Sequence, residues 1–247
     1  MKKNLLFVSL LMVAVAGMTV FEVSGADAKK KKKASVTLGP NPFVTHIFTA
    51  DPSAHVWKDG RLYVYPSHDV DPPRGCDLMD RYHVFSTDDM VNWTDHGEIL
   101  NSSQVPWGRP EGGFMWAPDC AYKNGTYYFY FPHPSGTDWN NTWKVGIATS
   151  KYPAKDFKVQ GYIKGIDDAC GMIDPCVFID DDGQAYLYWG NPNCFYVKLN
   201  KDMISYEGGI HAVPMKPESF GRREGNPKRA TLYEEAPWLY KRKGVYY

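Results

Sequence analysis

Three acidic residues beside prolines are the side chains of this sequence best suited to chemistry. Asp51 and Asp174 each directly precede a proline, and Glu235 stands two residues before one. If three carboxylates meet in the folded protein they cannot all ionise easily, because like charges close together repel. One carboxyl group then keeps its proton while another is ionised, which is the combination that general acid–base chemistry requires.

The residues around these carboxylates form a short cassette that occurs four times. Each cassette runs from its proline through a short apolar stretch to a turn that ends in Gly, and then to a Tyr-rich stretch. A near-constant spacing of this kind is typical of a repeated structural unit. The four prolines, which are 66, 57 and 62 residues apart, are Pro52, Pro118, Pro175 and Pro237.

Each cassette is predicted to be a β-hairpin, because a Gly-containing turn separates an apolar run from an aromatic and β-branched run. Units of about 60 residues without helical periodicity predict four-stranded blades of a β-propeller that carry long loops. The expected fold class is therefore all-β. Equivalent points of successive blades meet at the mouth of the central channel, so Asp51, Asp174 and Glu235 are expected to lie close together.

The N-terminal segment has the pattern of an export signal. Residues 1–28 contain Lys2 and Lys3, an apolar stretch and a small-residue ending, as signal peptides do. An uncleaved anchor is the alternative. Residues 29–40 are interpreted as a Lys-rich linker, and residues 41–247 as the folded domain. The protein is thus expected to be periplasmic or extracellular, without a membrane span after removal of the signal.

Composition narrows the class of partner. The chain has 28 Lys and Arg against 28 Asp and Glu, and no basic groove is evident, so a nucleic acid is not an expected partner. The 8 Trp, 17 Tyr and 12 Phe suit many short strands and also the stacking of flat ligands such as sugar rings. The five cysteines lack metal-binding spacing, which leaves disulfides and free buried thiols as alternatives.

Taken jointly, the motifs resemble glycoside hydrolase family 43, from about residue 41 to the end. The family is a five-bladed β-propeller of inverting enzymes that act on polysaccharides containing arabinose and xylose. The motifs that carry the resemblance are Asp51-Pro52, Ser86-Thr87-Asp88-Asp89-Met90-Val91-Asn92-Trp93, Trp116-Ala117-Pro118, Asp174-Pro175, Asp181-Asp182-Gly183 and Glu235-Ala236-Pro237.

The resemblance implies a role for each carboxylate. Asp51 is similar to the family's general base, Glu235 to its general acid, and Asp174 to the third carboxylate, which tunes the pKa of the acid and helps to place the substrate. Trp116 falls where the family often has an apolar wall around the terminal sugar. Ala236 departs from the pattern, because the family more commonly has Gly between the acid and the proline.

Other polar residues have simpler interpretations. His68 follows the first hairpin and is a candidate substrate contact, although a structural role is the alternative. Residues 180–182 are three aspartates in a row, but Gly183 directly after them favours a hairpin turn over a metal site. Glu234 is expected to be structural. No metal ligand is assigned and the chemistry needs no cofactor, although family members often carry a structural calcium ion held partly by a His of the last blade.

The sequence ends inside the fourth hairpin, so a five-bladed ring is expected to need further residues, and the sequence is interpreted as C-terminally incomplete. The expected function is that of an exported, inverting and exo-acting glycosidase that removes α-L-arabinofuranosyl or β-D-xylosyl units from plant polysaccharide or oligosaccharide and acts as a monomer, with an arabinofuranosidase as the first choice. Endo-1,5-α-L-arabinanase is one alternative. A non-catalytic carbohydrate-binding propeller and a structural hub propeller are alternatives of another class.

Overall fold

The computed structural model describes residues 41–71, 75–138, 141–166, 171–226, 229 and 231–247. The predicted signal peptide and linker lie outside these residues, as does Cys170. The four cysteines that are described, Cys76, Cys120, Cys176 and Cys194, are free thiols. Within the described part of the chain, no helix has the length and apolar character needed to cross a membrane.

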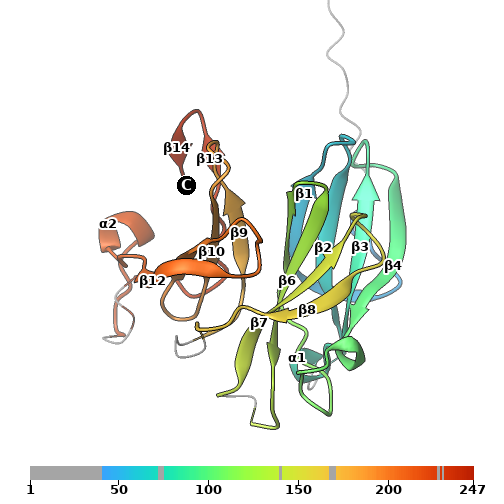
Figure 1. Cartoon of the computed structure of the whole chain (residues 1–247), viewed down its shortest axis with the longest axis horizontal. Coiled ribbons are helices and arrows are strands. Elements are labelled where there is room, and N and C mark those ends of the chain that lie inside the picture. The colour runs from blue at the N-terminus through green and yellow to red at the C-terminus, as the bar shows by residue number, and fades with distance from the viewer. Residues whose placement is uncertain (1–40, 72–74, 139–140, 167–170, 227–228, 230) are drawn as a thin grey trace, which may run out of the picture. The chain divides into compact units, whose positions relative to one another are not determined.

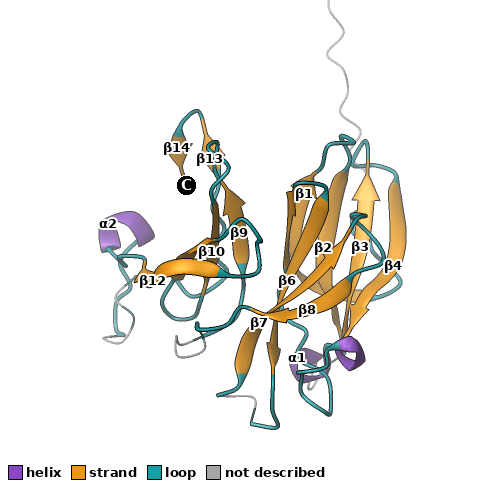
Figure 2. Ribbon diagram, viewed as in Figure 1, coloured by secondary structure: helices purple, strands orange, loops and turns teal. Residues whose placement is uncertain are grey.

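The chain forms three four-stranded antiparallel sheets, and the strands of each sheet follow one another in chain order (Figures 1 and 2). A separate two-stranded hairpin follows. The strands are β1 (Phe48–Val56), β2 (Leu62–Asp69), β3 (Arg81–Thr87), β4 (Trp93–Asn101), β5 (Asp119–Lys123), β6 (Thr126–Pro134), β7 (Trp143–Ser150), β8 (Lys158–Tyr162), β9 (Cys176–Ile179), β10 (Ala185–Trp189), β11 (Phe195–Leu199), β12 (Tyr206–Ala212), β13 (Lys241–Arg242) and β14 (Val245–Tyr246).

Helical structure among the described residues is confined to short turns. These are α1 (Gly75–Leu78), α2 (Pro217–Phe220) and a 3-10 turn at Ser102–Gln104. The all-β fold class is therefore confirmed, as is the four-stranded antiparallel unit.

The four predicted hairpins are also confirmed. They are β1–β2, β5–β6, β9–β10 and β13–β14. The turn glycine of each hairpin has positive φ, for example 81° at Gly60 and 77° at Gly244. Glycine adopts this conformation without the steric cost that a Cβ atom would add, so the local turn chemistry accounts for where each hairpin reverses.

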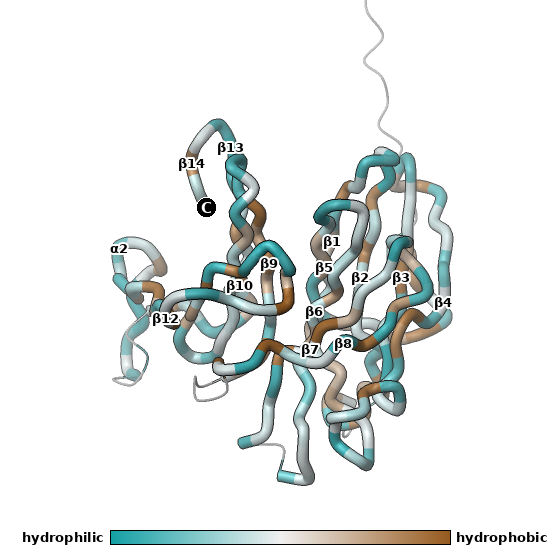
Figure 3. The backbone as a smooth tube through the Cα atoms, viewed as in Figure 1, coloured by the Kyte–Doolittle hydropathy of each residue, from teal (hydrophilic) through white to brown (hydrophobic). Residues whose placement is uncertain are grey.

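The middle sheet, β5–β8, is buried on both faces. Phe129 and Phe131 of β6 pack into a core shared with the first sheet, whereas Tyr130 between them packs into a core shared with the third. All three side chains have no exposed surface. Successive side chains of a strand point to opposite faces, so one strand supplies both cores. Burial of each such side chain contributes about 2 kcal/mol. Figure 3 shows the apolar stretches along the strands, with hydrophilic residues at the tip of the β13–β14 hairpin.

A buried carboxylate ties the first strands of the three sheets together. Asp119 begins β5 and is 1% exposed. One of its oxygens lies 2.6 Å from Nε2 of His55 in β1 and accepts the Cys120 N–H at 2.8 Å, and the other accepts the Val177 N–H of β9 at 2.7 Å. The His55 ring also stacks at 5.6 Å on Trp238 of the fourth cassette. This cluster therefore links the first three hairpins directly, and its His55 ring contacts the segment that leads into the fourth.

Candidate active site

Asp51 lies at a β-bulge in the first hairpin. The pairing of β1 with β2 shifts between Ala50 and Ser53, so that Asp51 and Pro52 together oppose a single residue of β2. Proline is tolerated at such a point because it has no N–H to donate to the ladder. Asp51 itself has a φ of 47°. Bulges re-aim side chains next to functional sites, and this one turns a strand residue into an exposed carboxylate.

Asp174 stands at the entry to the third hairpin and has nearly the same backbone conformation, with a φ of 56°. Its Oδ2 atom accepts the backbone N–H of Ala236 at 3.0 Å. Burial and the charge of Glu235 raise the pKa of Asp174 to about 7, and the charge of Asp51 adds to this, while the hydrogen bond from Ala236 opposes it. Near neutral pH this carboxyl group therefore holds a proton for part of the time.

Glu235 lies on the segment before β13, and its Oε2 atom accepts a hydrogen bond from Nδ2 of Asn191. Its place in the cassette differs from the expectation. The residue with positive φ directly before the proline is Ala236, at 55°, so Ala236 rather than Glu235 is the backbone counterpart of Asp51 and Asp174. The acid projects from one residue earlier, and the prediction that the three carboxylates occupy equivalent backbone points is corrected in this respect.

The three carboxylates nevertheless act on one another electrostatically. Although Asp51 is exposed at the surface, the surrounding protein removes part of the water from its carboxyl group, and this desolvation is the first cause of its raised pKa, followed by the charge of Glu235 and then that of Asp69. Glu235 also raises the pKa of Asp174, as does Asp51. Charges separated by much more than a Debye length of about 10 Å are largely screened. Side chains from three hairpins, more than 180 residues apart at the extremes, are thus brought to one place, as the repeat predicted.

Trp116 contacts both α1 and the first residue of β7. Its Nε1 atom donates to the Cys76 carbonyl at 2.6 Å, and its ring lies 4.4 Å from that of Trp143. Its own carbonyl accepts the Tyr82 hydroxyl at 2.6 Å. Burial, and then the charge of Asp174, raise the pKa of Tyr82, so the wall that carries Trp116 is close to the carboxylates. The side chain is partly buried and held on both sides.

His68 has a structural partner. Its Nδ1 atom lies 2.8 Å from Asp80 Oδ1. Burial alone would raise the pKa of Asp80, but hydrogen bonds from Arg81 and His68 lower it below its usual value. The imidazole is therefore engaged by a carboxylate, and its contact with substrate stays a prediction. The charge of the next residue, Asp69, also contributes to the raised pKa of Asp51, and no separate role was predicted for Asp69.

The aspartates at 180–182 form a turn, as expected. Lys241 Nζ lies 2.5 Å from Asp180 and 2.8 Å from Asp181, so a lysine neutralises two of the three carboxylates. Glu234 is paired with Arg223 and Arg229, which agrees with the structural role predicted for it. Across the described residues, no group of three or more His, Cys, Asp or Glu side chains is arranged to hold a metal ion.

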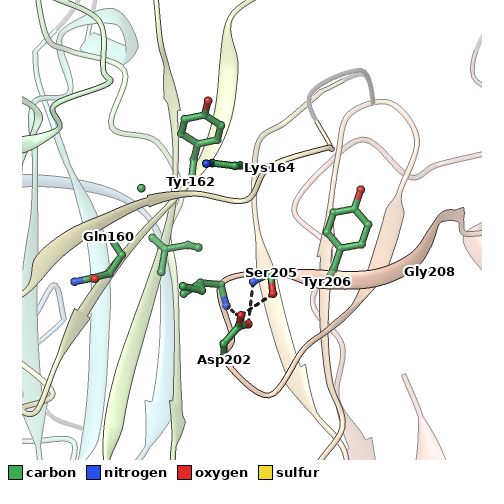
Figure 4. Close-up of a pocket in the computed structure, with 10 residues that line it drawn as sticks. Gln160, Tyr162, Lys164, Asp202, Ser205, Tyr206 and Gly208 are labelled. Carbon is green, nitrogen blue, oxygen red and sulfur yellow. Dashed lines mark hydrogen bonds between the residues drawn. The ribbon is translucent and has the colours of Figure 1, made fainter.

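Two cavities lie elsewhere among the strands. One, of about 590 Å³, is lined by residues of all four cassettes, among them His55, Cys120, Val177 and Trp238. The cassettes therefore surround a common space, as strands around a channel do. Another, of about 750 Å³, lies between β8 and β12 and is lined by Tyr162 and Tyr206 among others (Figure 4). None of the three carboxylates lines either cavity.

Comparison with known proteins agrees with this arrangement. The sequence profile of the glycosyl hydrolases family 43 matches residues 40–247. Xylosidase/arabinosidase 43A of Humicola insolens is 38% identical over 209 residues, which are 78% of this chain and 59% of that protein. A xylosidase/arabinosidase of Bacteroides ovatus is 32% identical over 240 residues, covering 81% of this chain and 69% of the relative.

The fold matches solved structures as well. A family 43 β-xylosidase/α-arabinofuranosidase from a compost microbial metagenome, solved with xylotriose in a calcium-free form, superposes with a TM-score of 0.68. It is 33% identical, and the match covers 82% of this chain and 70% of that one. The present chain thus spans between about 59% and 70% of the length of these relatives. With the profile match over residues 40–247, the sequence identity and the shared fold, the chain belongs to glycosyl hydrolases family 43.

Proposed function

We propose that the protein is an exported, inverting glycoside hydrolase that removes α-L-arabinofuranosyl or β-D-xylosyl residues from plant cell-wall polysaccharides. The observation that carries the proposal is the convergence of Asp51, Asp174 and Glu235 from three separate hairpins, where the charge of Glu235 raises the pKa of both Asp51 and Asp174. Family membership and relatives named as xylosidase/arabinosidase support the substrate class. The fold proposed is a five-bladed propeller, of which residues 41–247 supply three sheets and a further hairpin.

The proposed chemistry divides the work between two carboxylates. Asp51 takes a proton from a water molecule, whose oxygen attacks the anomeric carbon from one face of the sugar. Glu235 donates its proton to the glycosidic oxygen on the other face, so the bond to the leaving group breaks and the anomeric configuration inverts. The protons balance, because Asp51 gains one from the attacking water while Glu235 gives one to the leaving group, and exchange with solvent restores both groups before the next turnover.

Asp174 supports the proposed acid, Glu235, in this scheme. As a carboxyl group that is partly protonated near neutral pH, it lies close enough to Glu235 to disfavour ionisation of both groups together. A general acid must carry its proton at the working pH. The hydrogen bond from Ala236 to Asp174 links this carboxyl group directly to the segment on which Glu235 stands.

The position of Trp116 supports exo action. The short helix α1 supplies the Cys76 carbonyl to its indole N–H, and β7 begins with the Trp143 ring that packs against it. Two elements thus converge on one aromatic wall beside the carboxylates, which suits a pocket for a terminal sugar. An open groove, as an endo-1,5-α-L-arabinanase requires, is the second candidate. A calcium ion remains a proposal from the family alone, and no step above depends on it.

The test is hydrolysis of aryl α-L-arabinofuranosides and aryl β-D-xylosides by the full-length protein and its Asp51→Asn variant. Loss of the general base should lower kcat/KM by about 10² or more, and the faster substrate identifies the sugar. Asp88→Asn, which alters an exposed ion pair with Arg61, is the matched control and should keep full activity. The first-formed product, followed by NMR, should have the inverted anomeric configuration.

The outcomes separate the alternatives. A folded protein that cleaves internal bonds of arabinan but neither aryl glycoside is an endo-acting enzyme. Sugar binding without any hydrolysis indicates a carbohydrate-binding propeller, and absence of both indicates a structural hub. Unchanged hydrolysis by Asp51→Asn contradicts the assignment of the base.

A further inference from the structure

The proposed acid, Glu235, is held by a neutral amide whose orientation is itself fixed. Asn191 follows β10, and its Nδ2 donates to Glu235 Oε2 while its Oδ1 accepts from Nη2 of Arg229 at 3.0 Å. A guanidinium has donors only. The amide oxygen must therefore face Arg229, and the amide nitrogen must face Glu235. A flipped amide would place two donors against each other on one side and two acceptors on the other.

Arg229 is anchored at its other end by the neighbouring glutamate. Its Nη1 atom pairs with Glu234, and Arg223 pairs with the same carboxylate. Arg223 is in turn tied to the chain, because its Nε donates to the Thr231 carbonyl at 2.9 Å. Two consecutive glutamates thus have different partners. Glu234 forms ion pairs with two arginines, whereas Glu235 accepts a hydrogen bond from the neutral amide of Asn191.

This difference matters for a group that must donate a proton. A guanidinium in direct contact with a carboxylate favours its ionised form and lowers its pKa by about 1–3 units. Asn191 stands between Arg229 and Glu235. Its two hydrogen bonds fix the position of the Glu235 carboxyl group, and the guanidinium of Arg229 does not contact that group directly. The amide N–H also occupies Oε2, which leaves Oε1 of Glu235 as the oxygen that carries the transferable proton.

The backbone of Asn191 is fixed as firmly as its side chain. The preceding carbonyl, of Gly190, accepts the Tyr233 hydroxyl at 2.8 Å. On the other side lies Gly171, where a Cβ atom would come within 2.2 Å of the Asn191 carbonyl oxygen. The end of β10 is therefore pinned between the loop that leads to Asp174 and the segment that carries Glu235.

We propose that Asn191 is a positioning residue for the general acid: it fixes the rotamer of Glu235, directs its proton to Oε1 and keeps Arg229 out of direct contact. The inference rests on the proposed function, in which Glu235 is the acid. It predicts a defect in proton donation to the leaving group and not in attack by water.

Leaving-group dependence separates these two steps. A dinitrophenyl group departs with little help from an acid, whereas a sugar leaving group needs full protonation. For the full-length protein, kcat/KM would be measured on the dinitrophenyl glycoside of its preferred sugar and on the matching disaccharide. Asn191→Ala should lose about 10- to 100-fold on the disaccharide, part of the 10²–10⁴ that acid–base catalysis supplies, and less than about threefold on the dinitrophenyl glycoside.

Two further variants keep the test decisive. Asn191→Asp keeps the shape of the side chain and the acceptor for Arg229 but has no donor for Glu235. It should therefore show the same loss on the disaccharide alone. If the alanine variant is poorly folded, this variant provides the test. Asn193→Ala removes an exposed side chain in the same loop and should leave both rates unchanged.

An equal loss on both substrates, or no loss on either, in a folded variant overturns the role of Asn191 while leaving the proposed function intact. Failure of the wild type to cleave either substrate overturns the proposed function, and this inference with it.

Discussion

The backbone N–H of Ala236 donates a 3.0 Å hydrogen bond to Asp174 Oδ2, so the residue next to the proposed acid is bonded to the third carboxylate. Both residues have positive φ, 55° at Ala236 and 56° at Asp174. The spacing between the carboxyl groups of Asp174 and Glu235 is thus set by one hydrogen bond, from a main-chain N–H to a side-chain oxygen 62 residues earlier in the chain. A change in backbone conformation at Ala236 acts on both groups together.

Ala236→Gly should stabilise the protein. A non-glycine residue in the left-handed region costs about 1–2 kcal/mol, and glycine removes this cost but loses about 0.5–1 kcal/mol through greater freedom of the unfolded chain. The expected net gain is about 0.5 kcal/mol in the free energy of unfolding, measured in urea.

The second cassette supplies the matched control for this change. Ala117 also directly precedes a proline, but it is not among the residues with positive φ. Ala117→Gly should therefore destabilise the protein by about 0.5–1 kcal/mol. Changes of the same sign in the two variants would contradict the proposed strain at Ala236.

Asp174→Asn should flatten the dependence of stability on pH. The folded-state pKa of Asp174, about 7, lies above its ordinary value of 3.8, so between about pH 4 and pH 7 the folded state binds this proton more tightly than the unfolded chain does. Stability contributed by the group is present at low pH and is lost as the pH rises through that window. The wild type should therefore lose more stability over this range than the variant.

Urea unfolding at several pH values measures this slope. Asp182→Asn, in the exposed turn of the third hairpin, is the control and should follow the wild-type curve. Parallel curves for wild type and Asp174→Asn would show that Asp174 titrates normally in the folded protein.

Trp116→Ala should lower kcat/KM on small aryl glycosides by about tenfold or more, because an apolar wall of a sugar pocket contributes about 1–3 kcal/mol. Trp116→Phe keeps much of the wall but removes the N–H that bonds the Cys76 carbonyl, so an intermediate loss is expected. Steady-state kinetics measure both. Trp93→Phe changes a ring that stacks on Phe43 and is the control, which should have wild-type kinetics. If Trp116→Ala has no effect on kcat/KM, the main support for a closed pocket is removed.

Asp119→Ala should be strongly destabilising. It leaves the donors of His55, Cys120 and Val177 without their buried acceptor, and loss of one partner from a buried charged network costs about 3–5 kcal/mol. Thermal unfolding measures the effect. Asp88→Ala breaks an ion pair whose aspartate side chain is 65% exposed and should cost less than about 1 kcal/mol. Similar losses of stability in the two variants would argue against a stabilising role for the hydrogen bonds of Asp119.

The parts of the structure that depend on local chemistry were predictable from the sequence. Each hairpin follows from an apolar run, a turn ending in Gly and a Tyr-rich run, and all four form as expected. That Asp51, Asp174 and Glu235 approach one another was also predictable, because repeated units place corresponding segments together, although Glu235 projects from one residue before the equivalent point. The family followed from the same motifs.

The remaining parts depend on contacts that no local pattern encodes. The offset of Glu235 depends on the φ of Ala236, and the contact between Asn191 and Glu235 joins residues 44 apart through loops of irregular structure. Asp119 left one signal: it is the acidic residue of the only cassette whose proline has no acidic residue shortly before it. Because Asp119 follows its proline instead of preceding it, its side chain points into the interior. There it forms hydrogen bonds with two other hairpins and is not part of the site.

The left-handed backbone at two of the three carboxylates also bears on which acid each position can use. Aspartate is several-fold enriched among the non-glycine residues that adopt positive φ, whereas longer side chains have no such preference. Asp51 and Asp174 have this conformation and Glu235 does not. The choice of aspartate at two positions and glutamate at the third therefore has a conformational cause as well as a chemical one, and exchanging the two acids would disturb the main chain before it altered the reach of the carboxylate.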